Sequence, residues 1–427
     1  MISISKRFPK SFFSASSLST IFKFFLGINL LIFNKLIYNV IEPRSLDKVI
    51  FFVHLFPLII TILTVGLKVS IQKNVIAHNH QTNINNLSYF FSSYIITTLF
   101  SFPLYFLIFG QENNLINFFV FYFFCITVVS YQLIISILIG ARKFFFGNLF
   151  GGIPLNGFLF GFSLNSILYN LSISNSQINL SQFLQIISSL SFILLVFILV
   201  ILKIFSIPNN GKIKIFESIK NGFLIFSKEI SDIASFNLDL IFIRIFIGEH
   251  ILYLYTTVSS LARTLLMPKQ IFSPILIPFI HEAFSNKDRV KNVHFLRDIS
   301  KYGTFISSFI FIIYLLLFNS GFDFYRFDND LYYTAFSVFI ILSLSNIFMV
   351  AFGYAGVSLI VLNEEKAVFK IASYCLMFFI IMLFISSNFS SIIGVVISVF
   401  IFDLLKNLFY TKYLFNHYKI KLIANIF

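Results

Sequence analysis

The stretch FILLVFILVIL, residues 192–202, contains neither a charged residue nor a turn-forming one. A run of this kind is typical of a helix that crosses a lipid bilayer, which needs about 20 mostly apolar residues. Similar runs recur along the chain, and 58% of its 427 residues are hydrophobic while only 11% are charged. Soluble proteins carry about 25% charged residues. The chain lacks the polar residues that a water-facing surface requires, so we predict an all-α, polytopic membrane protein embedded in a lipid bilayer.

Working outward from residue 192, the apolar runs predict about twelve transmembrane helices separated by short loops. They cover residues 14–38, 49–70, 87–109, 115–138, 148–169, 183–202, 222–247, 251–280, 302–320, 331–360, 368–386 and 391–411. No connection between them is long enough to hold a folded soluble domain. The chain is therefore expected to lie almost entirely within the membrane and at its surfaces.

The basic residues predict the orientation of these helices. Most of the 31 lysines and arginines fall in loops on one side, and Lys406, near the end of the last span, is counted with them. Only Arg44, Lys48 and Arg326 fall in loops on the other side. Because Lys and Arg accumulate in cytoplasmic loops, this asymmetry predicts an even number of spans and two cytoplasmic termini.

A division is expected near the middle of the chain, where a long cytoplasmic connection separates the predicted sixth and seventh spans. We predict an N-terminal six-helix bundle over residues 1–205, a cytoplasmic linker over 206–221 and a C-terminal six-helix bundle over 222–427. Both bundles would begin at the cytoplasmic face, so any internal repeat is expected to be parallel.

Ionisable residues inside the predicted spans are the main functional signal, because each costs about 2.5–3.5 kcal/mol at the centre of a membrane helix. The seventh span holds Lys228, Glu229, Asp232 and Asp239. Lys228, Asp232 and Asp239 follow helical spacing, which predicts one polar stripe that faces protein or water. For Lys228 and Asp232, a structural ion pair within the helix is an equally good explanation.

Basic residues also lie within other spans. Arg263 lies near the middle of the eighth span and has no acidic neighbour on its own helix, while Lys269 lies closer to the cytoplasmic end. The first span contributes Lys23. Together with Lys228, these side chains predict a basic lumen that holds an anionic group.

Other classes of function find little support. Cys125 and Cys375 lie in apolar runs, so neither a disulfide framework nor a metal site is expected. The net charge of +14 is scattered among hydrophobic segments, so we expect no nucleic-acid partner. No phosphate-binding glycine loop, nucleophile elbow or zinc-binding helix motif occurs, and we expect neither a cofactor nor an enzyme.

The stretch DLIFIRIFIGEHILYLY, residues 239–255, resembles a segment of the polysaccharide flippases, which serve O-antigen and capsule synthesis. These flippases are part of the multidrug/oligosaccharidyl-lipid/polysaccharide exporter superfamily. Asp239, Gly248 and Tyr255 match the family pattern of an Asp, an apolar stretch, a Gly and a Tyr. Arg244 and Tyr253 stand where that pattern commonly has glycine.

The resemblance implies two six-helix bundles arranged as a V around a central cavity that opens alternately to each side. It implies a bacterial cytoplasmic (inner) membrane location and a substrate that is a polyprenyl-pyrophosphate-linked oligosaccharide. We expect the pyrophosphate to contact the basic residues, and a coupling cation, H⁺ or Na⁺, to bind the acidic ones. The basic residues are Arg263, Lys269, Lys23 and Lys228, and the acidic ones are Asp239, Asp232 and Glu229.

Two other functions stay open. A cation-coupled multidrug exporter of the same fold needs an acidic, apolar cavity, and acids and bases coexist in these spans. A membrane-embedded polysaccharide polymerase or acyltransferase usually has a large outer loop with catalytic arginines. Here the outer loops are short and only Arg326 offers comparable chemistry, which favours transport.

Overall fold

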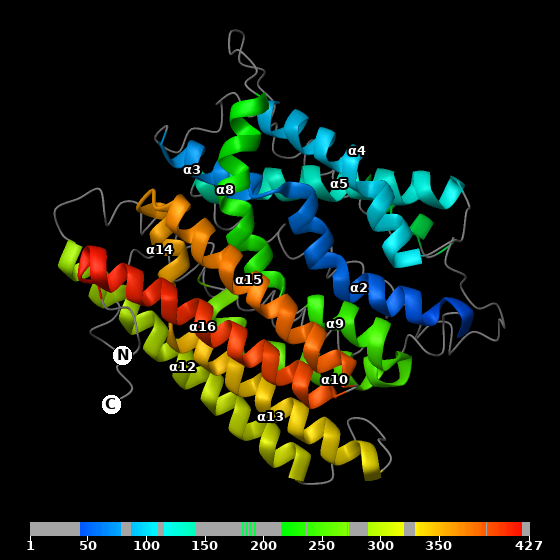
Figure 1. Ribbon diagram of the computed structural model, residues 1–427. Coiled ribbons are helices and arrows are strands. Elements are labelled where there is room, and N and C mark those ends of the chain that lie inside the picture. The colour runs from blue at the N-terminus through cyan, green and yellow to red at the C-terminus, as the bar shows by residue number, and fades with distance from the viewer. Residues whose placement is uncertain are drawn as a thin grey trace. The chain divides into compact units, whose positions relative to one another are not determined.

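The computed structural model is helical throughout the part of the chain that it describes (Figure 1). The described residues are 43–77, 87–109, 115–141, 215–234, 237–270, 272, 289–319, 329–389 and 391–420, with scattered positions between 182 and 193. The all-α fold class is confirmed. Among these residues, six helices are long and apolar enough to cross a membrane, and a bent pair makes a further span. The predicted spans at 14–38 and 148–169 lie outside the described residues, as does most of 183–202.

The chain divides into two compact units, residues 1–230 and 231–427. The division falls inside helix α8, Ile215–Ala234. Residues 215–221, which the sequence assigned to a linker, are therefore the first turns of a helix. The boundaries predicted for the two bundles stay a prediction.

The described helices of the first unit bear out the apolar runs of the sequence. Besides the greater part of α8, the unit contains α2 (Pro43–Thr64), α3 (Leu67–Ala77), α4 (Leu87–Phe109) and α5 (Leu115–Gly140). Helix α4 coincides with the predicted span, and α5 ends two residues beyond it. Aromatic rings lie between α2, α4 and α5, and Phe52 contacts Phe109, Phe121 and Phe124 in tilted and edge-to-face arrangements at centroid distances of 5.8–6.2 Å.

Helices α2 and α3 form one span that is bent by 58°. At the bend, Val65 and Gly66 adopt positive φ angles of 42° and 70°. Helix α8 crosses this bend closely, because a Cβ atom added to Gly66 would lie 2.2 Å from the carbonyl oxygen of Gly222. Only glycine at both positions allows the two backbones to approach to this distance.

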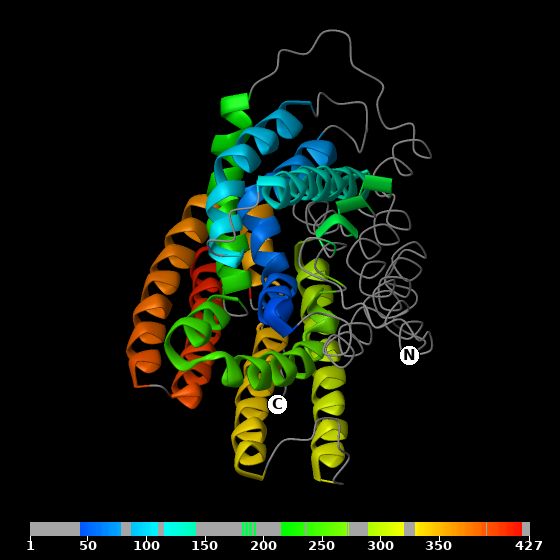
Figure 2. The same ribbon diagram turned by 90° about the vertical axis from the view of Figure 1, so that its right-hand side faces the viewer.

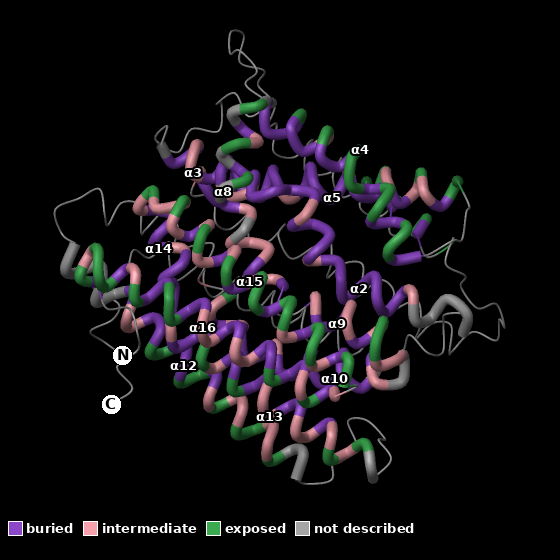
Figure 3. The backbone as a smooth tube through the Cα atoms, viewed as in Figure 1, coloured by how far each residue is buried: buried purple, intermediate pink, exposed green. Residues whose placement is uncertain are grey.

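The second unit contains four long helices that lie side by side in the order α12, α13, α16 and α15 (Figures 1 and 2). Their bounds are Arg289–Asn319, Asn329–Ala351, Ile392–Tyr418 and Glu365–Asn388. The short helix α14, Ala355–Val361, continues the span that α13 begins. Figure 3 shows exposed positions along α12 and α15. Large apolar side chains of these helices are exposed, among them Phe305 and Phe384. Outward apolar residues are expected where lipid replaces water as the solvent.

The predicted seventh and eighth spans are interrupted. Helix α8 ends at Ala234, and a short helix α9, Leu238–Phe242, continues into the π-helical segment η1, Ile243–Ile247. Helix α10, Glu249–Thr264, follows after Gly248. The expected single stripe from Lys228 to Asp239 was wrong, because α8 ends before Asp239 and the helical register is lost.

The break after α10 has an identifiable cause. Residues 265 and 266 form a turn, and Pro268 lies in the first turn of the helical segment 267–270 that follows. Proline tolerates the first turn of a helix because its missing N–H is not needed there. Side chains from neighbouring helices bond buried backbone carbonyls at this break: Asn346 Nδ2 donates to the carbonyl of Ala262 at 2.8 Å, and Ser307 Oγ donates to that of Leu265 at 2.6 Å.

Candidate functional site

The second unit brings together two of the three residues that carried the resemblance. Asp239 lies in the first turn of α9 and is only 1% exposed. The hydroxyl of Tyr255, on α10, donates a hydrogen bond to Asp239 Oδ2, and the backbone N–H of Leu240 donates to Oδ1 at 2.7 Å. A carboxylate at a helix N-terminus is favoured by the helix dipole. The buried carboxylate therefore has donors on both oxygens.

Gly248, the third residue of the resemblance, lies between these partners. Its φ of 120° is open to glycine and strained for residues with a side chain. The preceding π-turn is closed by the N–H of Gly248, which donates to the carbonyl of Ile243 at 2.9 Å. The chain can then reverse into α10, so that Tyr255 returns to Asp239. The spacing of Asp239, Gly248 and Tyr255 thus corresponds to a single turn of the chain that brings the tyrosine back to the aspartate.

Arg263 lies in the last turn of α10 and is half-buried. It interacts electrostatically with Asp239 and Tyr255. The sequence correctly showed no acidic neighbour on its own helix, since the acidic partner comes from α9. The residue predicted to bind phosphate and the residue predicted to bind a coupling cation are thus neighbours.

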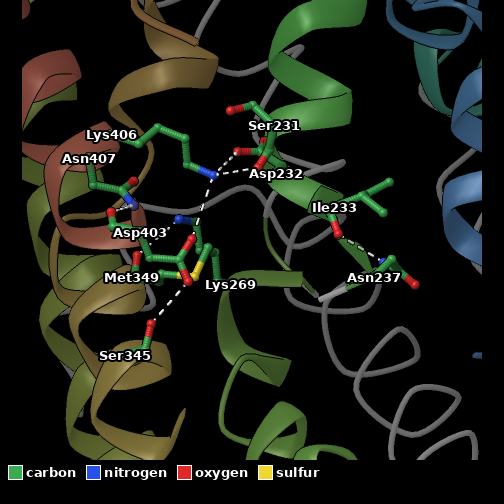
Figure 4. Close-up of polar contacts among 10 residues, drawn as sticks. All are labelled: Ser231, Asp232, Ile233, Asn237, Lys269, Ser345, Met349, Asp403, Lys406 and Asn407. Carbon is green, nitrogen blue, oxygen red and sulfur yellow. Dashed lines mark hydrogen bonds and ion pairs between the residues drawn. The ribbon is translucent and has the colours of Figure 1, made fainter. Parts of the chain in front are cut away.

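A second charged group surrounds Lys406 on α16 (Figure 4). The ammonium nitrogen lies 3.2 Å from Asp232 Oδ1 and 3.7 Å from Asp403 Oδ1, and it donates to the carbonyl of Ser231 at 2.9 Å. Asp403 in turn accepts a hydrogen bond from Ser345 on α13 at 2.9 Å. Lys406 is fully buried, with no exposed surface. Its assignment to the cytoplasmic loops was wrong, because α16 continues through residue 418.

Sequence reasoning missed Asp403 and Lys406 as a functional group. The signal was present, because both fall within the predicted span 391–411 and stand three residues apart, as ion pairs on a helix do. Asp232 forms an ion pair with Lys406, which lies on another helix. Lys228 and Glu229 are half-buried on α8 within the first unit. Asp232 is therefore the residue of the predicted stripe that takes part in this group.

Lys269 satisfies the backbone at the break between α13 and α14. The N–H of Gly353 donates to the carbonyl of Val350, and Lys269 Nζ donates to the neighbouring carbonyl of Met349 at 2.9 Å. The negative end of the helix dipole, at the C-terminus of α13, also stabilises an ammonium at this position. Lys23, the remaining predicted substrate residue, lies outside the described residues.

The described part of the chain shows no group of three or more His, Cys, Asp or Glu side chains that could hold a metal ion. Cys125 and Cys375 are both buried free thiols. The chemistry available in the second unit is therefore that of buried carboxylates, an ammonium and a guanidinium held by hydrogen bonds. Such groups bind ions or protons and recognise charged ligands.

No protein-family model and no curated protein matches the chain by sequence. Solved structures match it by fold. The MATE multidrug transporter DinF-BH, solved in complex with a ligand, has a TM-score of 0.70 at 14% identity, with 97% of each chain covered.

Two further structures agree. A MOP superfamily transporter from Pyrococcus furiosus, described as having a binding pocket of reverse polarity that suggests a different function, has a TM-score of 0.67 at 13% identity, covering 95% of this chain and 94% of its own. An outward-facing multidrug resistance MATE family transporter of the MOP superfamily has a TM-score of 0.66 at 15% identity, covering 93% and 94%. The chain therefore has the fold of MATE-type transporters of the MOP superfamily.

Proposed function

We propose that this protein is a membrane transporter that works by alternating access and carries a lipid-pyrophosphate-linked oligosaccharide across the cytoplasmic membrane. The fold supports transport, because the solved structures that it resembles are described as transporters and the match covers nearly the whole of each chain. A fold hosts many functions, so the substrate must be argued from the charged residues.

The observation that carries the choice of substrate is Arg263. It is the cationic side chain of the Asp239 group, and it keeps exposed surface while its carboxylate partner has almost none. A guanidinium binds phosphate oxygens through paired hydrogen bonds, whereas an ammonium acts as a point charge. Lys228, which is also half-buried, and Lys23 are the other proposed phosphate contacts. Lys269 joins them only in a conformation in which it leaves the Met349 carbonyl.

We assign the coupling of transport to Asp239. Its carboxylate is buried, is hydrogen-bonded by Tyr255 and interacts with Arg263, so a change in the charge of any of the three affects the others. Binding of a substrate phosphate to Arg263 would weaken the attraction between Arg263 and Asp239. A proton or Na⁺ arriving at Asp239 would then compensate the carboxylate. Glu229, with one buried carboxylate oxygen that makes no hydrogen bond in the described part of the chain, is a further candidate.

A cation-coupled multidrug exporter is the second candidate. Two of the similar structures are described as multidrug transporters, and one of them was solved with a bound ligand. The buried Asp239 is the kind of acidic group that a cationic drug requires. A third similar structure is described by a binding pocket of reverse polarity, so within this fold the charge of the pocket differs between proteins.

Reconstituted proteoliposomes distinguish the two candidates. Translocation of a fluorescent polyprenyl-pyrophosphate oligosaccharide is measured beside uptake of a cationic dye. We expect transport of the lipid substrate, and Arg263→Ala should slow it about tenfold or more, since a charge-assisted hydrogen bond contributes about 1.5–3 kcal/mol. Lys370→Ala, which removes one positive charge from an exposed position on α15, is the matched control and should transport normally.

The outcomes separate the proposals. Dye transport without lipid translocation would replace the flippase with the exporter. Equal rates for Arg263→Ala and Lys370→Ala would remove Arg263 from the substrate site. Asp239→Asn should alter the pH or Na⁺ dependence of transport, and an unchanged dependence would remove Asp239 from coupling.

A further inference from the structure

Lys406 lies within a cage of oxygen atoms whose composition is that of a cation site. Its ammonium contacts one backbone carbonyl, from Ser231, and two carboxylates, from Asp232 and Asp403, at 2.9, 3.2 and 3.7 Å (Figure 4). The ring of Phe402 lies beneath it, with its centroid 4.7 Å from the nitrogen. An ammonium has three donors and no acceptor. One of them is donated to the Ser231 carbonyl, and the two carboxylates are its ion-pair partners.

The cage carries more negative charge than the ammonium alone balances. Asp403 is 1% exposed and is held by Ser345, while the side chain of Asp232 is 39% exposed. Removing a charge from water costs several kcal/mol, and the cost is recovered only when an opposite charge and hydrogen bonds accompany it. The carboxylates therefore require a positive charge at the position that Lys406 fills.

A tyrosine on the same helix as Lys406 interacts with one carboxylate of the cage. Tyr410 lies about one turn beyond Lys406 on α16 and is 1% exposed. Its hydroxyl makes no hydrogen bond in the described part of the chain, and it interacts electrostatically with Asp232. Carboxylate, carbonyl and hydroxyl oxygens are the ligands that hard cations prefer. The oxygens around Lys406 are therefore of the kind that suits an inorganic cation.

We propose that Lys406 is a tethered counter-cation. Its ammonium occupies a cation site made of the Ser231 carbonyl, Asp232, Asp403 and Tyr410, and an inorganic cation enters that site only when the ammonium is removed. In the native protein, Asp232 and Asp403 then bind no free coupling cation. This inference stands independently of the transported substrate, because it concerns how the C-terminal unit balances its charges.

The test is thermal unfolding of the purified full-length protein in detergent, followed by circular dichroism. Unfolding is compared in choline chloride, NaCl and CaCl₂ at constant ionic strength, so that a site for Na⁺ is distinguished from one for Ca²⁺. We expect the native protein to unfold at the same temperature in all three. Lys406→Met should unfold at a lower temperature in choline, and Na⁺ or Ca²⁺ should restore at least half of the difference in a saturable manner, as binding to the folded state requires.

The controls isolate the site. Lys406→Arg keeps the positive charge and should show no cation dependence. Lys406→Met combined with Asp403→Asn removes one of the two carboxylates and should lose most of the saturable response.

Three results would overturn the proposal. The first is Lys406→Met that unfolds with no saturable cation effect. The second is a native protein that Na⁺ or Ca²⁺ stabilises and whose response Asp403→Asn abolishes. The third result concerns Asp232→Asn, which is used if Lys406→Met does not fold. This variant leaves one carboxylate, Asp403, for Lys406, so it should fold and show no cation response. A saturable stabilisation of Asp232→Asn by Na⁺ or Ca²⁺ would overturn the proposal.

Discussion

At the scale of single residues, the charges of the C-terminal unit are compensated across helices. Asp239 on α9 is bonded by Tyr255 on α10, and Lys406 on α16 is paired with Asp232 on α8. Breaking a buried charged pair by removing one partner is costly, because the other charge stays buried without compensation. These residues are therefore expected to be sensitive to substitution whether or not they contact a substrate.

The hydrogen bond from Tyr255 to Asp239 gives a direct prediction. Tyr255→Phe leaves the ring in place but removes the donor to a buried carboxylate, so we expect a loss of about 1–3 kcal/mol in the free energy of unfolding. Unfolding is followed with a thiol-reactive fluorophore, which labels the buried Cys125 and Cys375 as they become exposed. Tyr302→Phe, at an exposed position on α12, is the control and should be neutral. Equal stability of the two variants would show that the hydroxyl is not needed.

At the scale of elements, the helices are shaped by their breaks. The 58° bend between α2 and α3 admits α8, and the breaks after α10 and α13 are bonded by side chains from other helices. A break inside a membrane span exposes backbone groups that have no water to bond. The polar residues at these breaks therefore have a structural role that hydropathy alone does not reveal.

The crossing of α8 over the bend predicts a strict size limit at Gly222. A Cβ atom there would lie 2.6 Å from the carbonyl oxygen of Val65, so Gly222→Ala must separate the two backbones. We expect a loss of about 1–3 kcal/mol, as in other overpacked sites. Phe216→Ala, on an exposed position of the same helix, should change stability by much less. Thermal unfolding of both variants provides the check, and a stable Gly222→Ala protein would contradict the close approach.

Lys269 distinguishes a structural role from a substrate role at the break after α13. Lys269→Met removes the donor to the Met349 carbonyl, and we expect a loss of about 1.5 kcal/mol in the free energy of unfolding, the lower end for a charged hydrogen bond. Transport by the folded fraction should be retained if the cap is its only role. Lys370→Met is the matched control at an exposed position. A stable Lys269→Met protein with impaired transport would instead support contact with the substrate phosphates.

At the scale of the whole molecule, the distribution of basic residues predicts that both termini face the cytoplasm. The turn between α15 and α16 then faces outward, and the far end of α16 faces inward. Phe389 in that turn and Asn416 near the other end are both exposed. Two single substitutions to cysteine therefore report opposite sides of the membrane.

In right-side-out vesicles, a membrane-impermeant maleimide should label Phe389→Cys at once and Asn416→Cys only after permeabilisation. The unsubstituted protein should stay unlabelled, because Cys125 and Cys375 are buried. The opposite pattern would reverse the topology and, with it, the direction of transport that we propose.

The spans that the sequence predicted best are those that contact lipid with few polar interruptions. The span at residues 87–109 was predicted without error, since hydropathy measures transfer into the bilayer and that transfer determines whether such a segment spans the membrane. The seventh span was predicted as one helix and is broken. Before the break, the carbonyl of Ser231 accepts a hydrogen bond from Lys406 on another helix. Asp403 and Lys406 were in view in the sequence, but nothing local indicated that Asp232 would complete their group.

The sequence by itself determined the lipid environment, the helical class and the bounds of spans such as 87–109, because each follows from the free energy of moving local segments between water and lipid. The spacing of Asp239, Gly248 and Tyr255 was also visible, although its meaning as a folded-back pair was not. Only the tertiary structure decided which charges meet. Residues 175 positions apart, such as Ser231 and Lys406, become partners through helix packing, and the electrostatic energy of a buried charge depends on those partners rather than on its neighbours in the chain.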